Sequence, residues 1–162
     1  VPDFPRAGIV FKDLTPLLAS AEALRCCVDA LVDHLDGRRV DAVVGVEARG
    51  FILAAPVAYR LGAGFVPVRK PGKLPWRVES EAYALEYGTD ALEIHADALV
   101  PGSRVMVVDD VLATGGTAAA TVTLVERLGA EVVALGFVLE LGFLGGRSRL
   151  EGRDVISLLA YE

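Results

Sequence analysis

The stretch from Val105 to Ala118 constrains the fold more than any other part of the chain. It reads VMVVDDVLATGGTA. Four consecutive apolar residues predict a strand that is buried on both faces, as strands of parallel sheets are. Two adjacent acids and a turn of small residues then lead into a helix. This succession is typical of an α/β protein with a parallel sheet.

The turn after the two acids has the composition of an anion site. It consists of Ala113, Thr114, Gly115, Gly116 and Thr117. Glycines let backbone N–H groups approach an anion, threonine hydroxyls add donors, and the helix N-terminus favours negative charge. Asp109 and Asp110 would repel a phosphate unless sugar hydroxyls or Mg²⁺ lay between them. The segment therefore suits a ligand with a phosphate beside free ribose hydroxyls. A P-loop would need a lysine after its second glycine, and none stands here.

The rest of the chain alternates between strand and helix patterns. Strands are expected at 40–46, 65–68, 132–139 and 155–159, besides the one from Arg104, and helices between Ser20 and Gly37, at 50–61 and at 116–128. This order predicts a doubly wound, mostly parallel sheet flanked by helices in a single domain over residues 1–162. We expect residues 70–80 to form a loop, followed by a small hairpin with strands at 83–87 and 92–95 and a turn at 88–90.

Charge and cysteine usage exclude several classes of function. The net charge of −6 and the pI of about 5.0 argue against non-specific binding to nucleic acid or to a membrane surface. No apolar run is long enough to cross a bilayer. The adjacent Cys26 and Cys27 lie in a helical pattern, which suits reduced thiols in the cytoplasm. Neither His34 nor His95 has a partner at the spacing of zinc ligands.

Two further segments carry charge just after predicted strands. Glu47–Ala48–Arg49–Gly50 follows the strand that ends at Val46, and an arginine with backbone donors can bind an anion there. An ion pair between Glu47 and Arg49 is the alternative. Arg69, Lys70 and Lys73 open the predicted loop, and a solvated basic loop is the alternative for them.

Several runs together resemble one known family. VVDDVLATGGTA resembles the phosphoribosyl-pyrophosphate (PRPP) motif of the type I phosphoribosyltransferases. The runs PDFPRAGIVFKDLTP, RKPGKLP, LEYGTDALEIH and ISLLAYE narrow the resemblance to the adenine phosphoribosyltransferases, in the order and spacing of that family. The resemblance covers nearly the whole chain. Two features depart from it: the sequence starts at VPDFP, without the helical segment that usually precedes PDFP in that family, and Lys12 stands where an arginine is common.

The resemblance implies a site for each part of two substrates. A small hood from residues 1–18 and 140–150 would lie over the active site, with a mobile loop and hairpin at 70–96. Asp109 and Asp110 would hold the ribose hydroxyls, and residues 113–117 the 5′-phosphate. The implied pyrophosphate contacts are Ala48, Arg49 and Gly50, with added charge from Arg69, Lys70 and Lys73. The implied adenine contacts are Val10, Phe11, Lys12 and Leu141, with Glu86 at the imidazole edge.

The implied reaction is a step of purine salvage, in which adenine and PRPP give AMP and pyrophosphate. Arg49 and Mg²⁺ would stabilise the leaving pyrophosphate, and Glu86 would accept a proton from adenine. The resemblance also implies a cytoplasmic homodimer. Two alternatives stay open: a phosphoribosyltransferase for hypoxanthine, guanine or orotate, and a non-catalytic PRPP-sensing regulator of nucleic acid, which the acidic pI disfavours.

One backbone feature is expected between Val46 and Gly50. A turn that aims successive N–H groups at pyrophosphate often needs unusual geometry. We therefore expect a non-proline cis peptide bond or a disfavoured pair of torsion angles there, and the resemblance supports this.

Overall fold

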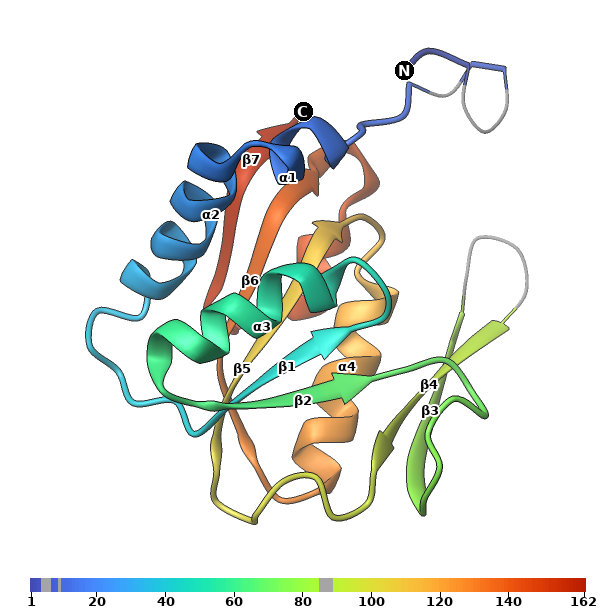
Figure 1. The fold of residues 1–162 in the computed structure, drawn as a ribbon. Coiled ribbons are helices and arrows are strands. Elements are labelled where there is room, and N and C mark those ends of the chain that lie inside the picture. Colours follow the sequence, from blue (N-terminus) through green and yellow to red (C-terminus); the bar gives the residue numbers. More distant parts are fainter. Residues whose placement is uncertain (4–6, 9, 85–88) are drawn as a thin grey trace.

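The fold is known from a computed structural model that describes residues 1–3, 7–8, 10–84 and 89–162. Its centre is a five-stranded sheet in the order β2-β1-β5-β6-β7 (Figure 1). The strands are β1 (Ala42–Val46), β2 (Gly64–Val68), β5 (Arg104–Leu112), β6 (Glu131–Leu141) and β7 (Val155–Tyr161). All neighbouring strands in this sheet pair in parallel. The predicted α/β fold with a mostly parallel sheet is therefore confirmed.

Helices cover both faces of the sheet. Figure 1 shows α1 (Thr15–Ala19), α2 (Ala21–Asp33) and α3 (Gly50–Leu61) on one face and α4 (Gly116–Arg127) on the other. Side chains of β5 alternate between the two cores. Met106 and Val108 join the core with α2 and α3, whereas Val105 and Val107 join the core with α4. All four are fully buried, which confirms a strand buried on both faces.

Capping residues mark the start of α2 and the end of α3, and a glycine in β1 lets α3 pack closely on the sheet. The Ser20 hydroxyl accepts a hydrogen bond of 3.2 Å from the Ala23 N–H, so Ser20 is the predicted N-cap of α2. Helix α3 continues through Pro56 and ends before Gly62. A Cβ atom at Gly45 of β1 would lie only 2.7 Å from the Ala54 Cβ. The glycine therefore lets α3 pack closely on β1.

The predicted hairpin is present, but with other boundaries. Strands β3 (Val78–Ala84) and β4 (Thr89–His95) pair antiparallel. Residues 78–80, expected in the loop, belong to β3, and residues 89–90, expected in the turn, begin β4. Arg127 at the end of α4 pairs with Glu81 and donates a hydrogen bond of 2.8 Å to the Ser80 carbonyl. These contacts with α4 extend the ladder through a polar stretch. Residues 85–88, which include the rest of the expected first strand, lie outside the described residues.

Two segments extend past the carboxyl ends of the strands. Figure 1 shows the N-terminal segment and the β3–β4 hairpin projecting on this side of the sheet. In the N-terminal segment, Val1 and Phe11 exchange two backbone hydrogen bonds of 2.9 Å each. Two short 3₁₀ turns, η1 (Gly142–Leu144) and η2 (Gly146–Leu150), follow β6.

Among the helices of the described residues, none is long and apolar enough to cross a membrane.

Candidate functional site

The sheet changes its direction of winding between β1 and β5. The chain leaves β1 through α3 to β2 on one side, and leaves β5 through α4 to β6 on the other. Ligands of such sheets bind in the crevice at the carboxyl ends of the strands, at this switch point. A cleft of about 440 Å³ lies there. Its lining consists of Val46, Glu47, Ala48, Arg49, Lys70, Tyr83, Leu92, Asp109, Asp110, Val111 and Thr117.

Two adjacent carboxylates line this cleft. Asp110 is 7% exposed, and its Oδ2 lies 2.6 Å from Nε of Arg49. Asp109 Oδ1 accepts a hydrogen bond of 2.8 Å from the Asp110 N–H. Burial raises the pKa of Asp109 well above its ordinary value, and the neighbouring charge of Asp110 acts in the same direction. Carboxylates compensated so poorly by the protein are typical of functional sites, where a ligand supplies the missing donors.

The turn between β1 and α3 brings Arg49 to the cleft. Helix α3 begins at Gly50, where a Cβ atom would lie 2.8 Å from Asp109 Oδ1. Only glycine allows this approach of the helix to β5. The peptide bond between Glu47 and Ala48 is cis, which confirms the expected backbone feature.

Glu47 and Arg49 do not pair with each other as the alternative had it. Arg49 pairs with Asp110. Glu47 accepts a hydrogen bond of 3.0 Å from the Lys70 N–H and pairs with Arg69 at 3.1 Å. The Lys70 N–H and then Arg69 hold the pKa of Glu47 below its ordinary value, against the effect of burial. Glu47 therefore stays ionised and fixes the end of β2 beside the cleft.

The predicted anion turn connects β5 to α4. Residues 113–117 line a separate hollow of about 50 Å³ beside the cleft, and Thr117 borders both. Gly115 has a φ of +79° and caps α4. Gly146 of η2 packs directly against this turn. A Cβ atom at Gly115 would lie 2.3 Å from the Gly146 carbonyl oxygen, and one at Gly146 would lie 2.1 Å from the Ala113 carbonyl oxygen. Sequence reasoning missed Gly146, because nothing local to it signals a contact with a turn 30 residues earlier.

Lys70 reaches the cleft from the end of β2 and contacts the hairpin. Its ammonium pairs with Asp90 and donates a hydrogen bond of 3.2 Å to the Tyr83 hydroxyl. Burial acts to lower the pKa of Lys70, but hydrogen bonds to Asp90 and Tyr83 outweigh it and raise this pKa above its ordinary value. The Lys70 bond in turn lowers the pKa of Asp90. Both groups are therefore charged at neutral pH.

Tyr83 and Asp90 are residues that the sequence analysis missed. They are cross-strand partners in the hairpin. The alternating pattern would have placed them opposite each other if the hairpin boundaries had been predicted correctly.

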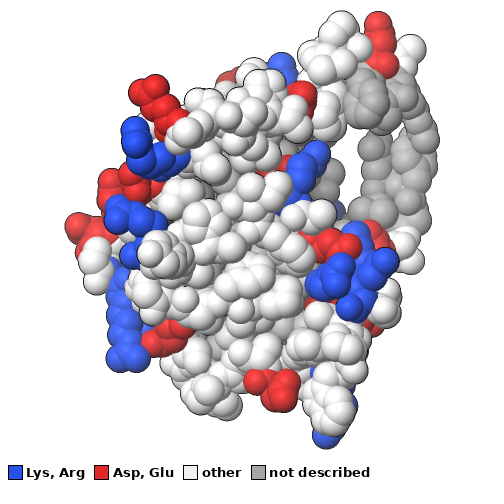
Figure 2. All heavy atoms as spheres, viewed as in Figure 1, with Lys and Arg blue, Asp and Glu red and all other residues white. Residues whose placement is uncertain are grey.

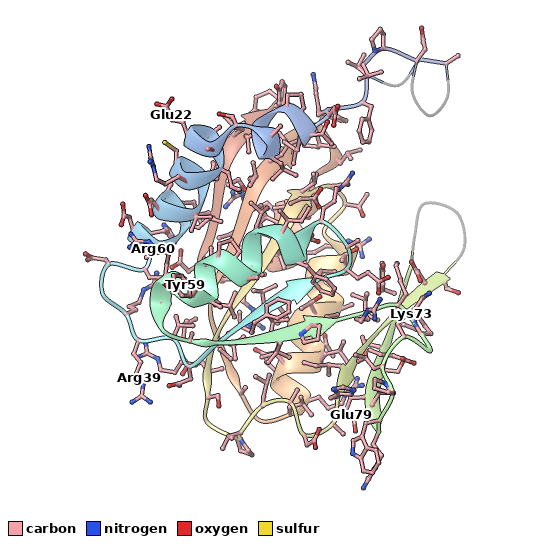
Figure 3. The ribbon with its side chains drawn as sticks, viewed as in Figure 1. Glu22, Arg39, Tyr59, Arg60, Lys73 and Glu79 are labelled. Atoms are coloured by element: carbon pink, nitrogen blue, oxygen red, sulfur yellow. The ribbon has the colours of Figure 1, made fainter. Side chains whose placement is uncertain are left out.

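The other two predicted basic residues lie outside the cleft lining. Arg69 pairs with Glu47 and donates a hydrogen bond of 3.3 Å to the Lys73 carbonyl. Lys73 is exposed, and Figure 3 shows it on the loop after β2, on the side of the hairpin. Lys70 is thus the one of these three cations that lines the cleft.

The residues expected to bind adenine lie elsewhere along the same edge. Phe11 and Lys12 line a hollow of about 390 Å³ that also includes Tyr161. The Lys12 Nζ lies 4.0 Å from the centre of the Tyr161 ring, and Tyr161 pairs with Leu141 across β6 and β7. Val10 is exposed on the N-terminal segment. Glu86 lies outside the described residues.

Within the described part of the chain, no group of three or more His, Cys, Asp or Glu side chains could hold a metal ion. Carboxylate oxygens are nevertheless the ligands that Mg²⁺ prefers, and it commonly combines one or two of them with water and substrate phosphates. The pair formed by Asp109 and Asp110 therefore fits an ion that is bound together with a phosphate ligand, not one held by the protein alone.

Comparison with known proteins gives one consistent result. Residues 13–154 match the family model of the phosphoribosyl transferase domain. A curated protein of Desulfitobacterium hafniense (strain Y51), named adenine phosphoribosyltransferase, is 59% identical over 161 residues, which cover 99% of this chain and 93% of the relative. One of the same name from Acidothermus cellulolyticus is 61% identical over 159 residues, covering 98% of this chain and 90% of the relative.

Solved structures agree with these matches. The crystal structure of adenine phosphoribosyltransferase from Thermoanaerobacter pseudethanolicus has a TM-score of 0.95 at 55% identity and covers 99% of this chain and 94% of its own. The Saccharomyces cerevisiae structure, a complex with an imino-altritol bisphosphate and adenine, has a TM-score of 0.93 at 44% identity. The match covers 98% of this chain and 92% of the yeast chain.

Proposed function

The chain belongs to the phosphoribosyl transferase domain family, among its adenine phosphoribosyltransferases, and we propose that it transfers the phosphoribosyl group of PRPP to adenine, giving AMP and pyrophosphate. The observation that carries this is the cleft at the switch point. Its lining combines two cations, two adjacent carboxylates and Thr117 of the anion turn. A ligand with a pyrophosphate at one end, ribose hydroxyls in the middle and a phosphate at the other end matches that order.

The anion turn and the acid pair would bind the ribose phosphate. Backbone N–H groups of residues 113–117 and the N-terminus of α4 provide donors for the 5′-phosphate. Asp109 and Asp110 would accept hydrogen bonds from the ribose hydroxyls. Since burial raises the pKa of Asp109, donors supplied by the ligand would relieve a penalty that the protein itself leaves standing.

Positive charge at the other end of the cleft would bind the pyrophosphate. Arg49 and Lys70 line this part of the cleft, and backbone groups of Ala48 and Gly50 lie in the same turn. Arg69 and Lys73 would add to the positive potential from outside the lining. As the bond between the anomeric carbon and pyrophosphate breaks, these cations stabilise the charge that develops on the leaving group. Mg²⁺ held between PRPP and the acid pair would supply further positive charge to that group.

The hood residues would bind the base. Phe11 and Leu141 would enclose the adenine ring, the main chain of Val10 would pair with its polar edge, and Lys12 lies beside them. Glu86 would accept the proton of N7 while N9 forms the new bond to the anomeric carbon. Residues 1–18 and 140–150 form the proposed hood of this single domain. Closure of the loop and hairpin at 70–96 would exclude water, which otherwise competes as a nucleophile.

An apolar surface supports a homodimer. Ile52 and Tyr59 of α3 and Phe65 of β2 are 47%, 86% and 38% exposed. Figure 2 shows a broad uncharged area over α3 on this face, and Figure 3 shows Tyr59 on the same helix. Exposed apolar side chains within an uncharged area are typical of protein interfaces.

Two free cysteines, Cys26 and Cys27, suit the reducing cytoplasm that we propose as the location.

The alternative functions differ from the proposed one in the base that they bind or in the surface charge that they need. Adenine is the base in the names of the relatives and in the yeast complex, which favours it over hypoxanthine, guanine and orotate. A nucleic-acid-binding regulator would need a basic face. On the face in Figure 2, basic and acidic side chains are interspersed.

The deciding experiment is an assay of AMP formation from adenine and PRPP. Hypoxanthine, guanine and orotate serve as competing bases at equal concentration, and reactions with and without Mg²⁺ test the metal. We expect AMP to form only when the base is adenine and Mg²⁺ is present. Turnover of another base at a comparable kcat/KM would overturn the choice of adenine, and no turnover of any base would overturn the enzymatic function.

A further inference from the structure

The hydroxyl of Tyr83 contacts both phosphate-binding ends of the cleft. It accepts a hydrogen bond of 3.2 Å from the Lys70 ammonium and one of 3.4 Å from the Thr117 hydroxyl. It donates one of 3.3 Å to Oδ2 of Asp90. Lys70 belongs to the proposed pyrophosphate end and Thr117 to the anion turn, so one side chain joins two segments that lie 47 residues apart in the sequence.

One arrangement of the Tyr83 hydroxyl satisfies all three contacts. A phenol has one proton to donate and two lone pairs that accept. Asp90 is ionised because its bond from Lys70 lowers its pKa, so Asp90 can only accept. The Lys70 ammonium can only donate. The Tyr83 proton therefore points to Asp90, and its lone pairs face Lys70 and Thr117.

Attachment of the hairpin does not require this hydroxyl. The start of β3 is held to α4 by the ion pair of Arg127 with Glu81 and by the hydrogen bond from Arg127 to the Ser80 carbonyl. The ring of Tyr83 packs against the core on the α4 side. Ring and ion pair together attach the hairpin, so the contacts of the hydroxyl with Lys70 and Thr117 in the cleft lining are not needed for that attachment.

We propose that Tyr83 is a positioning residue that fixes Lys70 relative to Thr117 and so sets the spacing between the two phosphate-binding ends. The proposal rests on the proposed function. It assigns to Tyr83 a selectivity for a ligand with both phosphate groups on one ribose, over a ligand that engages one end alone. Tyr83 touches neither the base nor the reacting carbon in this role.

The test compares Tyr83→Phe with Glu81→Gln, which weakens the attachment of the hairpin at a site outside the cleft. Loss of hydrogen bonds to a charged group predicts that Tyr83→Phe raises the KM for PRPP by about 5- to 30-fold. The adenine KM should not change, and kcat should stay within about threefold of the wild type. Inhibition by AMP and by pyrophosphate, each of which engages one end, should weaken less than PRPP binding. Glu81→Gln should leave all five constants near the wild-type values.

A double-mutant cycle tests the route through Lys70. In a Lys70→Met background, Tyr83→Phe should change the KM for PRPP by less than about twofold, because the group that Tyr83 positions is gone. Fully additive effects would overturn the proposal. An unchanged PRPP KM in Tyr83→Phe, or an equal loss in Glu81→Gln, would do the same. These results need a wild type that makes AMP; if it makes none, the proposed function fails instead.

Discussion

Carboxylates at the two ends of the same sheet are in opposite electrostatic states. At the amino end, Asp154 precedes β7; its Oδ1 lies 2.7 Å from Nε2 of His34, and its Oδ2 pairs with Arg38. Burial alone would raise the pKa of Asp154, but the bonds from Arg38 and His34 outweigh this effect. The pKa of Asp154 therefore lies below its ordinary value. At the carboxyl end, burial and the charge of Asp110 raise the pKa of Asp109. An ionised aspartate thus stabilises the fold at the amino end of the sheet and destabilises it at the carboxyl end.

The difference shows which end is organised for a ligand. Arg38 also donates hydrogen bonds to the Leu35 and Val133 carbonyls, so the amino-end cluster joins α2 to β6 and β7 with its polar groups satisfied. The acid pair at the carboxyl end has one cation, Arg49, and that arginine is itself half exposed. Sites that bind or react commonly retain such unfavourable groups at the expense of stability. Four changes would break or sharpen this contrast.

The largest effect is expected from Asp109→Asn combined with Asp110→Asn. Asparagine keeps the shape of aspartate, but it accepts weaker hydrogen bonds from the ribose hydroxyls and lacks the negative charge that attracts Mg²⁺. The affinity for PRPP should therefore fall by about 100-fold or more. Titration calorimetry with PRPP measures this. Asp154→Asn is the control at the other end and should bind PRPP as the wild type does. Wild-type affinity in the double variant would contradict the assignment of the acid pair.

Gly146→Ala should have the next largest effect. The added Cβ would lie 2.1 Å from the Ala113 carbonyl oxygen and would displace the anion turn. PRPP and AMP should both bind about 10- to 100-fold more weakly, since overpacking of this kind costs about 1–3 kcal/mol. Gly64→Ala is the matched control at the amino end, where the nearest atom to the new Cβ, the Asp41 carbonyl oxygen, is 3.8 Å away. Equal losses in both variants would show that the contact with Gly146 does not shape the turn.

Asp109→Asn alone should make the fold more stable at neutral pH, by about 1–2 kcal/mol. A carboxyl group whose pKa is raised by folding lowers stability as the pH rises from the ordinary value of 3.8 through its folded pKa, and the loss persists above that. The advantage of the variant should therefore vanish below pH 3.8 and grow as the pH rises above that value. Urea unfolding at several pH values measures it. A variant less stable than the wild type at pH 7 would contradict the raised pKa.

Asp154→Asn should have the smallest effect, with the opposite sign. The variant should be less stable at pH 7 by about 1 kcal/mol, a figure reduced for the partial exposure of the cluster. A lowered pKa contributes stability above the ordinary value of 3.8, and this is lost as the pH falls through the folded pKa. The two variants should thus converge with the wild type in acid and diverge in opposite directions at neutral pH. If the stabilities of the two variants changed with pH in the same direction relative to the wild type, the contrast between the two ends of the sheet would be contradicted.

The sequence predicted the parts of this protein that depend on local pattern. The apolar run before Asp109 and the small residues up to Thr117 were enough to predict a buried strand, a turn and a helix, and the structure has all three. That this turn binds an anion stays a prediction. Ser20 marks the start of α2 by capping chemistry that acts over a few residues. The parallel pairing of the strands followed from the alternation of strand and helix patterns along the chain.

What was missed depends on contacts between distant segments. The ladder of β3 extends through residues 78–82, of which the middle three are polar, because Arg127 of α4 binds Glu81, and no local pattern contains that contact. Tyr83 and Asp90 were overlooked because a hairpin register that is wrong by a few residues hides every cross-strand pair. Helix α1 is a single short turn with proline in it, below the length at which helical periodicity is visible. The roles assigned to Val10, Phe11, Lys12, Leu141 and Glu86 stay predictions.

The contact between Gly115 and Gly146 limits how this enzyme could be recombined with its relatives. The two backbones meet so closely that neither position accommodates a side chain, although one follows β5 and the other follows β6. The segment after β6 belongs to the proposed hood, which is the natural part to exchange when base preference is to be altered. A grafted segment that lacked a glycine at this point would disturb the turn that we propose for the 5′-phosphate. A chimera that keeps the geometry of this turn must therefore carry both glycines across its junction.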